Sequence, residues 1–357
     1  MEIHNYKDRI LYADIIRILA ILFVVIIHVS AYSMSIKDFG SRDWWVGHTI
    51  NSLVRSGVTL FVMLSGMLLL SKDYKLSDFL KKRFIRVFIP YVVWSAIYIL
   101  ARYLFRGERF TPLQIVNIFT GFKAETHIWF IGVILGLYIV TPIIRIYVKN
   151  AEKGNILYFL LVWFIFTSII PVIAIFTPIK EIYTKAEFAT GFTGCYILGY
   201  FLSKQYFKRE LMKYFIILFL LGYLLTIFLS YLSASKIIFG DGEHYLYFYD
   251  YLTPNVIMMA LSLFILLKGI NYKKYFDNRE RLVKFIVNLS SSSFGVYLVQ
   301  VLFIGLLDSG FFGLAPPING LFDPIIEIPM NFIIVTFLSF LTVNLLKKIP
   351  VVRFIVP

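Results

Sequence analysis

Long apolar runs separated by short polar breaks dominate the chain. A run of about 17 to 25 apolar residues is long enough to cross a hydrocarbon core of about 30 Å, and roughly ten such runs occur. They lie near residues 10–32, 50–70, 84–105, 127–148, 155–177, 188–204, 213–235, 248–270, 284–307 and 327–346. The sixth run is short and rich in glycine. The pattern predicts an all-α polytopic membrane protein, a bundle of about ten transmembrane helices forming a single domain over residues 1–357.

Composition supports a bilayer as the environment. Of the 357 residues, 59% are hydrophobic, whereas a soluble domain has about 45 to 50%. The formal net charge of +14 does not indicate nucleic-acid binding, because the lysines and arginines fall between apolar runs rather than on one basic face. A single cysteine, Cys195, excludes an intramolecular disulfide. No residues have the spacing of metal ligands, so no metal is expected.

Basic residues fill every second loop. Lys7 and Arg9 precede the first run. Lys72, Lys75, Lys81, Lys82 and Arg83 follow the second run, and Lys149 and Lys153 follow the fourth. Lys204, Lys208 and Arg209 follow the sixth run, and Lys273, Lys274, Arg279 and Arg281 follow the eighth. Lys347, Lys348 and Arg353 follow the tenth. Because cytoplasmic loops carry the excess of Lys and Arg, we expect a multi-pass plasma-membrane protein with both termini cytoplasmic.

The first apolar run contains an arginine and a histidine, Arg17 and His28. Eleven residues at about 100° each make three turns plus about 20°, so the two side chains share one helix face and lie about 16 Å apart along the axis. Ionisable side chains at such depth usually face a protein interior or a wet cavity. The alternative is that Arg17 pairs with Asp14, three residues earlier, while His28 makes a hydrogen bond at the interface.

A second basic element, "KKRFIRVFIPY", follows the second run. Arg83 and Arg86 are three helical positions apart, so both guanidinium groups can point to one mouth of the bundle. Paired guanidinium groups suit phosphate because each presents a planar fork of donors and keeps its charge. Simple anchoring by positive charge on the cytoplasmic side is the alternative.

Other marked residues have two interpretations each. His127 and Trp129 lie at the outer end of the fourth run, where aromatic residues anchor at the interface, and acceptor binding is the functional alternative. Arg55 either lines a cavity or extends to the interface. We expect His48 at a solvated end.

Small residues recur at two places. Gly132 and Gly136 form a G-x-x-x-G pair, and Ser290–Ser293 is a run of four serines. Both patterns predict close helix packing rather than chemistry.

Several of these elements resemble the integral-membrane acyltransferase family 3. Arg17 and His28, with ten residues between them, match the arginine and histidine of its first-span signature. Arg83 and Arg86 match its R-x-x-R element. The further matches are Ser65 and Gly66 in "FVMLSGMLLL", and His127, Trp129, Phe130, Tyr138 and Pro142 in "HIWFIGVILGLYIVTPIIR". "SSSSFGVYLVQ" is similar to a segment that often ends in histidine, but Gln300 stands there and cannot transfer a proton.

The resemblance implies transfer of an acyl group, usually acetyl, from cytosolic acyl-CoA to a hydroxyl, often on an extracytoplasmic or lipid-linked glycan. In that reaction Arg83 and Arg86, with Arg145, would hold the phosphates of the donor. Arg17 would line the route into the bundle, and His28 would act as general base on the acceptor hydroxyl.

Two other classes stay open. A transporter or flippase of a glycan or small solute also places arginine and histidine within a bundle, and a structural assembly partner is the third class. The absence of a convincing inverted repeat argues against a transporter. Release of free CoA that depends on acyl-CoA would distinguish the enzyme. The residues do not identify the acceptor or distinguish acetyl from succinyl.

Overall fold

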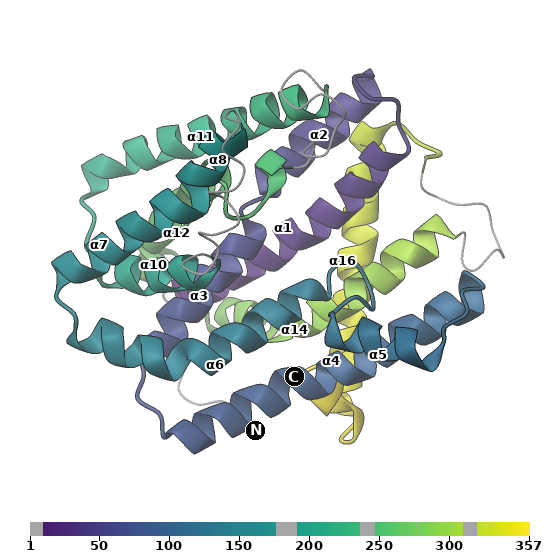
Figure 1. Cartoon of the computed structure of the whole chain (residues 1–357), viewed down its shortest axis with the longest axis horizontal. Coiled ribbons are helices and arrows are strands. Elements are labelled where there is room, and N and C mark those ends of the chain that lie inside the picture. The colour runs from purple at the N-terminus through teal and green to yellow at the C-terminus, as the bar shows by residue number, and fades with distance from the viewer. Residues whose placement is uncertain (1–9, 176–190, 236–246, 277, 310–319) are drawn as a thin grey trace. The chain divides into compact units, whose positions relative to one another are not determined.

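The computed structural model describes residues 10–175, 191–235, 247–276, 278–309 and 320–357 (Figure 1). All regular structure in these ranges is helical. The predicted all-α class and the multi-pass membrane architecture are therefore confirmed.

Nine segments of the described chain are long and apolar enough to cross a membrane. They comprise α1 (Leu11–Ser35), α2 (Arg42–Val54) together with α3 (Gly57–Leu70), α4 (Leu76–Phe105), α6 (Trp129–Asn150), α7 (Lys153–Phe164) with the π-helical turn η2 (Ile165–Ile169) and α8 (Ile170–Ile175), η4 (Arg209–Leu211) with α11 (Met212–Ala234), η5 (Tyr247–Tyr249) with α12 (Pro254–Lys268), α14 (Glu280–Asp308), and α16 (Pro324–Lys348). Each corresponds to one of the ten predicted runs.

The remaining predicted run, near 188–204, begins outside the described residues. Its described part is α10 (Thr193–Lys204), and the other short helices are α5 (Pro112–Thr120), α13 (Tyr272–Phe276) and η6 (Val352–Ile355). The basic residues Lys7 and Arg9 also lie outside the described residues.

Two helices begin earlier than the hydrophobic pattern indicates. α4 starts at Leu76 rather than near residue 84, so the basic segment that follows the second run is helical. α2 occupies residues that the pattern left as a connection. Hydropathy marks where a helix enters hydrocarbon, whereas Leu, Lys and Arg are good helix formers that continue a helix into water.

The described chain divides into two compact units, each assembled from three stretches. The first unit contains residues 1–24, 48–72 and 143–290, and the second contains residues 25–47, 73–142 and 291–357. The organisation as a single domain stays a prediction.

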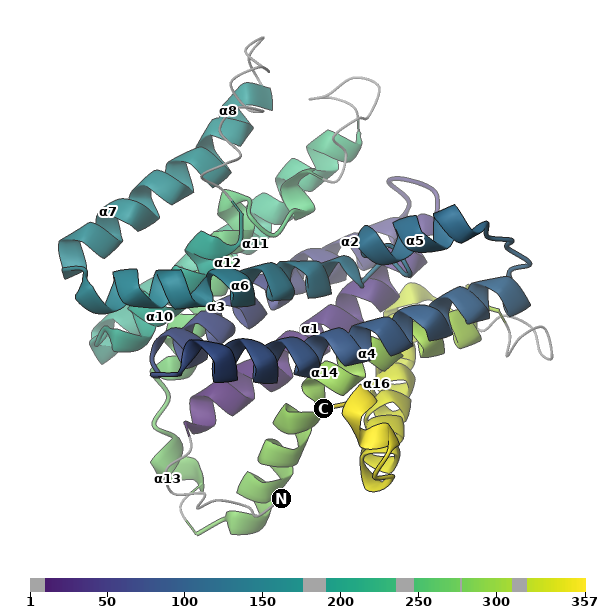
Figure 2. The same cartoon turned by 60° about the horizontal axis from the view of Figure 1, so that its bottom comes forward.

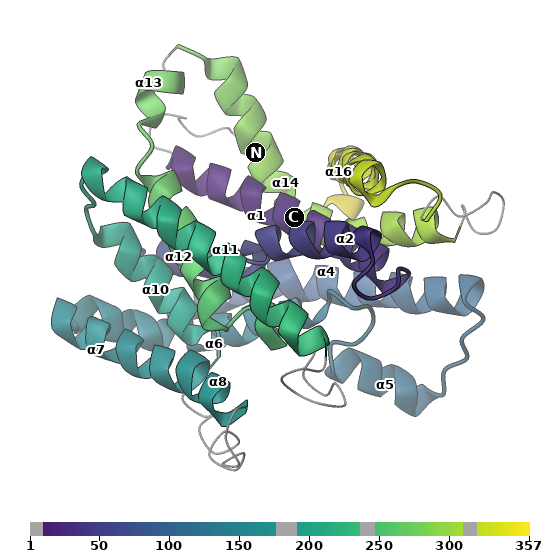
Figure 3. The ribbon, with the colours of Figure 1, turned by 90° about the horizontal axis from the view of Figure 1, so that it is seen from above.

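In the first unit, α3 packs against α10 and α12, while α11 runs alongside α12 (Figures 2 and 3). Two glycines set the contact between α3 and α10. A Cβ added to Gly66 would lie 1.8 Å from the carbonyl oxygen of Tyr196, and one added to Gly199 would lie 1.9 Å from that of Met63. The two backbones therefore touch directly, which only glycine permits at both positions.

At the G-x-x-x-G pair the described residues show one close contact, at Gly132, and it is with a side chain outside the helices. A Cβ on Gly132 would meet the ring of Phe122 at 3.0 Å, and one on Gly136 would meet no described atom within 4 Å. A small-residue spacing shows that close approach is possible, but the tertiary fold decides which glycines have a neighbour.

In the second unit, the C-terminal turn η6 contacts both α4 and α16. The indole nitrogen of Trp94 on α4 donates to the Ile355 carbonyl at 2.9 Å. Tyr98, one turn further along α4, donates to the Leu298 carbonyl of α14 at 2.6 Å. These two bonds fix α4 against α14 and the C-terminal turn.

Candidate active site

Two histidines from distant parts of the chain meet in the second unit. His28 lies on the second half of α1, and His127 lies in the turn before α6. Their ring centroids are 6.1 Å apart, and the rings are nearly perpendicular at 78°. The structure thus brings together the histidine of the first-span signature and the histidine of the H-x-W-F element.

Aromatic side chains enclose His127. The ring centroids of Tyr98 and Tyr297 lie 5.3 and 5.1 Å from that of His127. The Tyr297 hydroxyl donates to the backbone carbonyl of His127, so α14 also holds the turn in place. His127 is only 2% exposed, so its ring is enclosed by the protein of this unit.

The surroundings disfavour the charged form of the His127 imidazole. Burial lowers the pKa of His127 well below its usual range, and the neighbouring His28 lowers it further. The Leu298 carbonyl opposes this shift, but it already accepts the Tyr98 hydroxyl. Within the described residues, neither ring nitrogen of His127 forms a hydrogen bond of ordinary geometry. A neutral imidazole with both nitrogens available can bind a hydroxyl group.

Trp129 follows His127 by two residues and Gln300 follows Tyr297 by three, but their environments differ. Gln300 is fully buried on α14, and its amide nitrogen reaches the Tyr297 carbonyl only at 3.5 Å. Trp129, on the first turn of α6, is 36% exposed, and its ring centroid lies 5.9 Å from that of Phe130. A role for Trp129 in acceptor binding stays a prediction.

Arg17, which is partly exposed, joins the buried Asp14 and Ser290 in a polar cluster in the first unit. Its Nη1 donates to the Ser290 hydroxyl at 2.9 Å, and that hydroxyl donates to Asp14 Oδ1 at 2.6 Å. The guanidinium also lies 3.6 Å from the Asp14 carboxylate. The ion pair between Arg17 and Asp14 that the sequence spacing suggested is therefore present. The serine run at 290–293 signalled only packing, so the polar role of Ser290 was missed.

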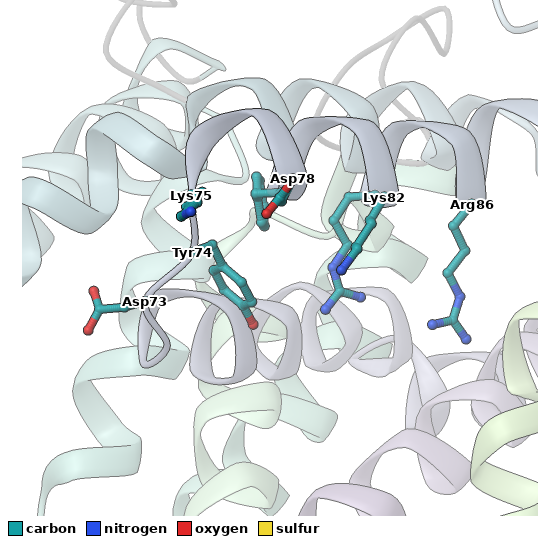
Figure 4. Close-up of a pocket in the computed structure, with 8 residues that line it drawn as sticks. Asp73, Tyr74, Lys75, Asp78, Lys82 and Arg86 are labelled. Carbon is teal, nitrogen blue, oxygen red and sulfur yellow. The ribbon is translucent and has the colours of Figure 1, made fainter. Parts of the chain in front are cut away.

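Arg83 and Arg86 lie in a groove along the first turns of α4. The groove is a cavity of about 380 Å³ lined by Asp73, Tyr74, Lys75, Asp78, Phe79, Lys82, Arg83 and Arg86 (Figure 4). Among the described residues, neither arginine forms an ion pair. Like-charge repulsion acts between Arg83 and Arg86, and between Arg86 and Lys347 at the end of α16. Such a set of neighbouring cations favours binding of a polyanion.

Three other residues marked in the sequence lie in the first unit. Arg145 Nη1 donates to the Lys72 carbonyl at 3.5 Å, and its use beside the two groove arginines stays a prediction. The Arg55 guanidinium lies 4.2 Å from the centroid of the Tyr249 ring. The expected solvated position of His48 is wrong, because α2 carries this residue into the interior: His48 is fully buried, donates to a backbone carbonyl at 3.0 Å and accepts the Tyr249 hydroxyl.

No three His, Cys, Asp or Glu side chains gather closely enough to hold a metal ion in the part of the chain that the structure describes. The candidate site therefore consists of the imidazole pair and the cationic groove, which suit proton transfer and anion binding.

Comparison with known proteins identifies one family. The family described as "Acyltransferase domain" matches residues 10–344, nearly the whole chain. No curated protein and no solved structure matches. Because the match spans the apolar helices, the histidine pair and the arginine pair, the chain belongs to acyltransferase family 3 and is a multi-pass membrane acyltransferase.

Proposed function

We propose that the protein moves an acyl group, most simply acetyl, from cytosolic acyl-CoA to a hydroxyl of an extracytoplasmic or lipid-linked glycan. One observation carries the proposal: His28 lies beside the buried His127, with 6.1 Å between ring centroids. Family membership supports acyl transfer, and the cations of the groove support an anionic donor.

His28 acts as the general base in this proposal. Its imidazole takes the proton of the acceptor hydroxyl while the hydroxyl oxygen attacks the thioester carbonyl carbon. The carbon–sulfur bond then breaks, and the departing thiolate takes the proton back from His28, so that an ester and free CoA are formed. Acid–base assistance of this kind contributes about 10²- to 10⁴-fold to the rate.

His127 and Trp129 bind the acceptor. The His127 and His28 rings lie edge-on at 6.1 Å between centroids, and the acceptor hydroxyl binds between them while its proton moves to His28. The exposed part of Trp129 provides an aromatic surface for the sugar ring to which that hydroxyl belongs.

Arginines hold the donor. Arg83 and Arg86 bind the phosphates of CoA through planar forks of donors. The basic residues of the sequence suggest Arg145 as a further residue for the donor. Arg17, ion-paired with Asp14, lines the route of the pantetheine arm. The alternating basic loops support a cytoplasmic position for the groove, where acyl-CoA is present.

The test uses purified protein in detergent, an acyl-CoA and a thiol reagent that detects free CoA. His28→Ala should keep acyl-CoA binding but lower transfer by about 10²- to 10⁴-fold. His48→Gln changes another buried histidine and should leave transfer near the wild-type rate. A folded His28→Ala protein with near-normal transfer would refute the general-base role. Lack of CoA release by wild-type protein with any acyl-CoA and a glycan acceptor would refute the enzyme proposal in favour of transport.

The acceptor can be identified in cells. Mass spectrometry of surface glycans from cells with and without the protein should reveal a missing acyl mass. That mass distinguishes acetyl from succinyl, and unchanged glycans would refute the proposed acceptor class.

A further inference from the structure

The groove along α4 has an ordered chemistry from one end to the other. Tyr74 lies in the turn before the helix, Asp78 in its first turn, and the cations follow. Asp78, Lys82 and Arg86 are spaced by four residues, so they follow one another along one face with a rise of about 6 Å per step. Figure 4 shows these three side chains extending to the same side of α4, with the Tyr74 ring at the beginning of the row.

Charge is unequal along this row. The lining contains four cations and two carboxylates, and the carboxylates, Asp73 and Asp78, lie at the end near Tyr74. The fourth cation, Lys75, lies with the carboxylates and leaves that end with one net negative charge. Lys82, Arg83 and Arg86 lie at the other end, and none of them forms an ion pair with a described residue. A phosphate is therefore attracted more strongly at the Arg86 end, where three cations lie, than at the Tyr74 end, where two carboxylates outnumber one cation.

An aromatic ring supports Tyr74. The Phe79 ring is buried, with its centroid 5.3 Å from that of Tyr74 at a tilt of 42°. Phe79 in turn contacts Tyr138 of α6, at 6.2 Å between centroids. Tyr74 is half-buried and lines the cavity, so its ring is both held in place and accessible from the groove.

We propose that Tyr74 is the stacking platform for the adenine base of the acyl-CoA donor, an inference that rests on the proposed function. The base lies on the Tyr74 ring at the acidic end, where Asp78 accepts a hydrogen bond from the exocyclic amino group. The phosphates lie beyond it, at Lys82, Arg83 and Arg86. This order matches CoA, whose aromatic base is at one end and whose anionic groups come before the pantetheine arm.

The placement also fixes the direction of the donor. Arg86 lies further along α4 than Asp78, towards the apolar part of the helix. With the base at Tyr74 and the phosphates at Arg86, the pantetheine arm leaves the groove towards the membrane rather than towards the cytoplasm. The groove thus selects a donor that carries a nucleotide over one that carries only phosphopantetheine.

Binding measured by calorimetry on the full-length protein in detergent tests the platform without requiring turnover. Wild-type protein should bind CoA and ADP more tightly than inorganic pyrophosphate, which has the phosphates but no base. Tyr74→Ala should weaken CoA and ADP by about 5- to 150-fold, the usual effect of losing one base–aromatic stack, and leave pyrophosphate unchanged. Tyr74→Phe keeps the ring and should bind CoA like the wild type. Tyr206→Ala, at a tyrosine that is 88% exposed, is the matched control.

The outcomes separate the two proposals. If wild-type protein binds CoA and Tyr74→Ala binds it equally well, the platform is refuted while the donor proposal stands. The platform is also refuted if wild-type protein binds pyrophosphate as tightly as ADP. If wild-type protein binds no CoA, the donor assignment itself is refuted.

Discussion

Replacing Gly66 with alanine tests whether the S-G element serves close helix packing. The added Cβ would lie 1.8 Å from the Tyr196 carbonyl oxygen, whereas ordinary contact begins near 3.4 Å, so α3 and α10 must separate by about 1.6 Å (3.4 minus 1.8). The added Cβ is bonded directly to the backbone of α3, and the carbonyl oxygen belongs to the backbone of α10, so neither atom can rotate away. Overpacking of this kind costs about 1 to 3 kcal/mol, and we expect the upper end. The better helix propensity of alanine offsets about 1 kcal/mol, which leaves a net loss of about 2 kcal/mol.

Thermal unfolding of purified protein in detergent measures this loss. Gly136→Ala is the matched control, because it makes the same change in a spanning helix where a Cβ meets no described atom within 4 Å. Gly199→Ala should destabilise as much as Gly66→Ala, since its Cβ would lie 1.9 Å from the Met63 carbonyl. The double variant should lose less than the sum, because helices already separated by the first alanine accommodate the second. If Gly66→Ala unfolds at the same temperature as Gly136→Ala, the packing argument is refuted.

Three further predictions concern the donor groove, the polar cluster and the topology. Arg83→Lys and Arg86→Lys should each weaken CoA binding by about tenfold although the charge is kept, because the planar fork is lost; unchanged affinity in both variants would favour simple anchoring. Ser290→Ala should destabilise the protein by about 1 to 3 kcal/mol, because the buried Asp14 carboxylate and the partly exposed Arg17 guanidinium lose a shared hydrogen bond. Ser291→Ala, at the neighbouring exposed serine, should leave the melting temperature unchanged. On intact cells, a membrane-impermeant maleimide should label a cysteine introduced within 33–49 but not one within 72–82. The native Cys195 is buried and should give little background labelling. The reverse labelling would show that the topology is inverted and that the groove lies outside.

The boundaries of the helices show where local pattern stops being informative. Hydropathy predicted α1, α6 and α14 to within a few residues, because their ends coincide with the ends of apolar runs. It missed the start of α4, since a helix continues through charged residues once its backbone bonds are formed. That extension places Tyr74 directly before the helix and aligns it with Arg86 in one groove, and the sequence carried no signal for this role of the tyrosine.

Glycine and serine patterns were the least reliable guides. The G-x-x-x-G pair is recognisable in the sequence, yet the backbones touch at Gly66 and Gly199, which belong to different helices and form no local motif. Ser290 resembles its neighbours in the chain but alone joins Asp14 to Arg17. Which small residue has a partner depends on the element packed against it.

The sequence by itself determined what the bilayer and helix periodicity control. Apolar runs of sufficient length must form helices in lipid because the backbone has no other hydrogen-bond partners there, and residues three, four or eleven positions apart share a helix face. On this basis the sequence alone predicts that Arg83 and Arg86 point to the same side of their helix. Tertiary structure alone decided the meeting of His28 and His127, because 98 residues separate them in the chain. Contacts over such separations depend on how several helices pack together, and no local pattern of residues encodes that packing.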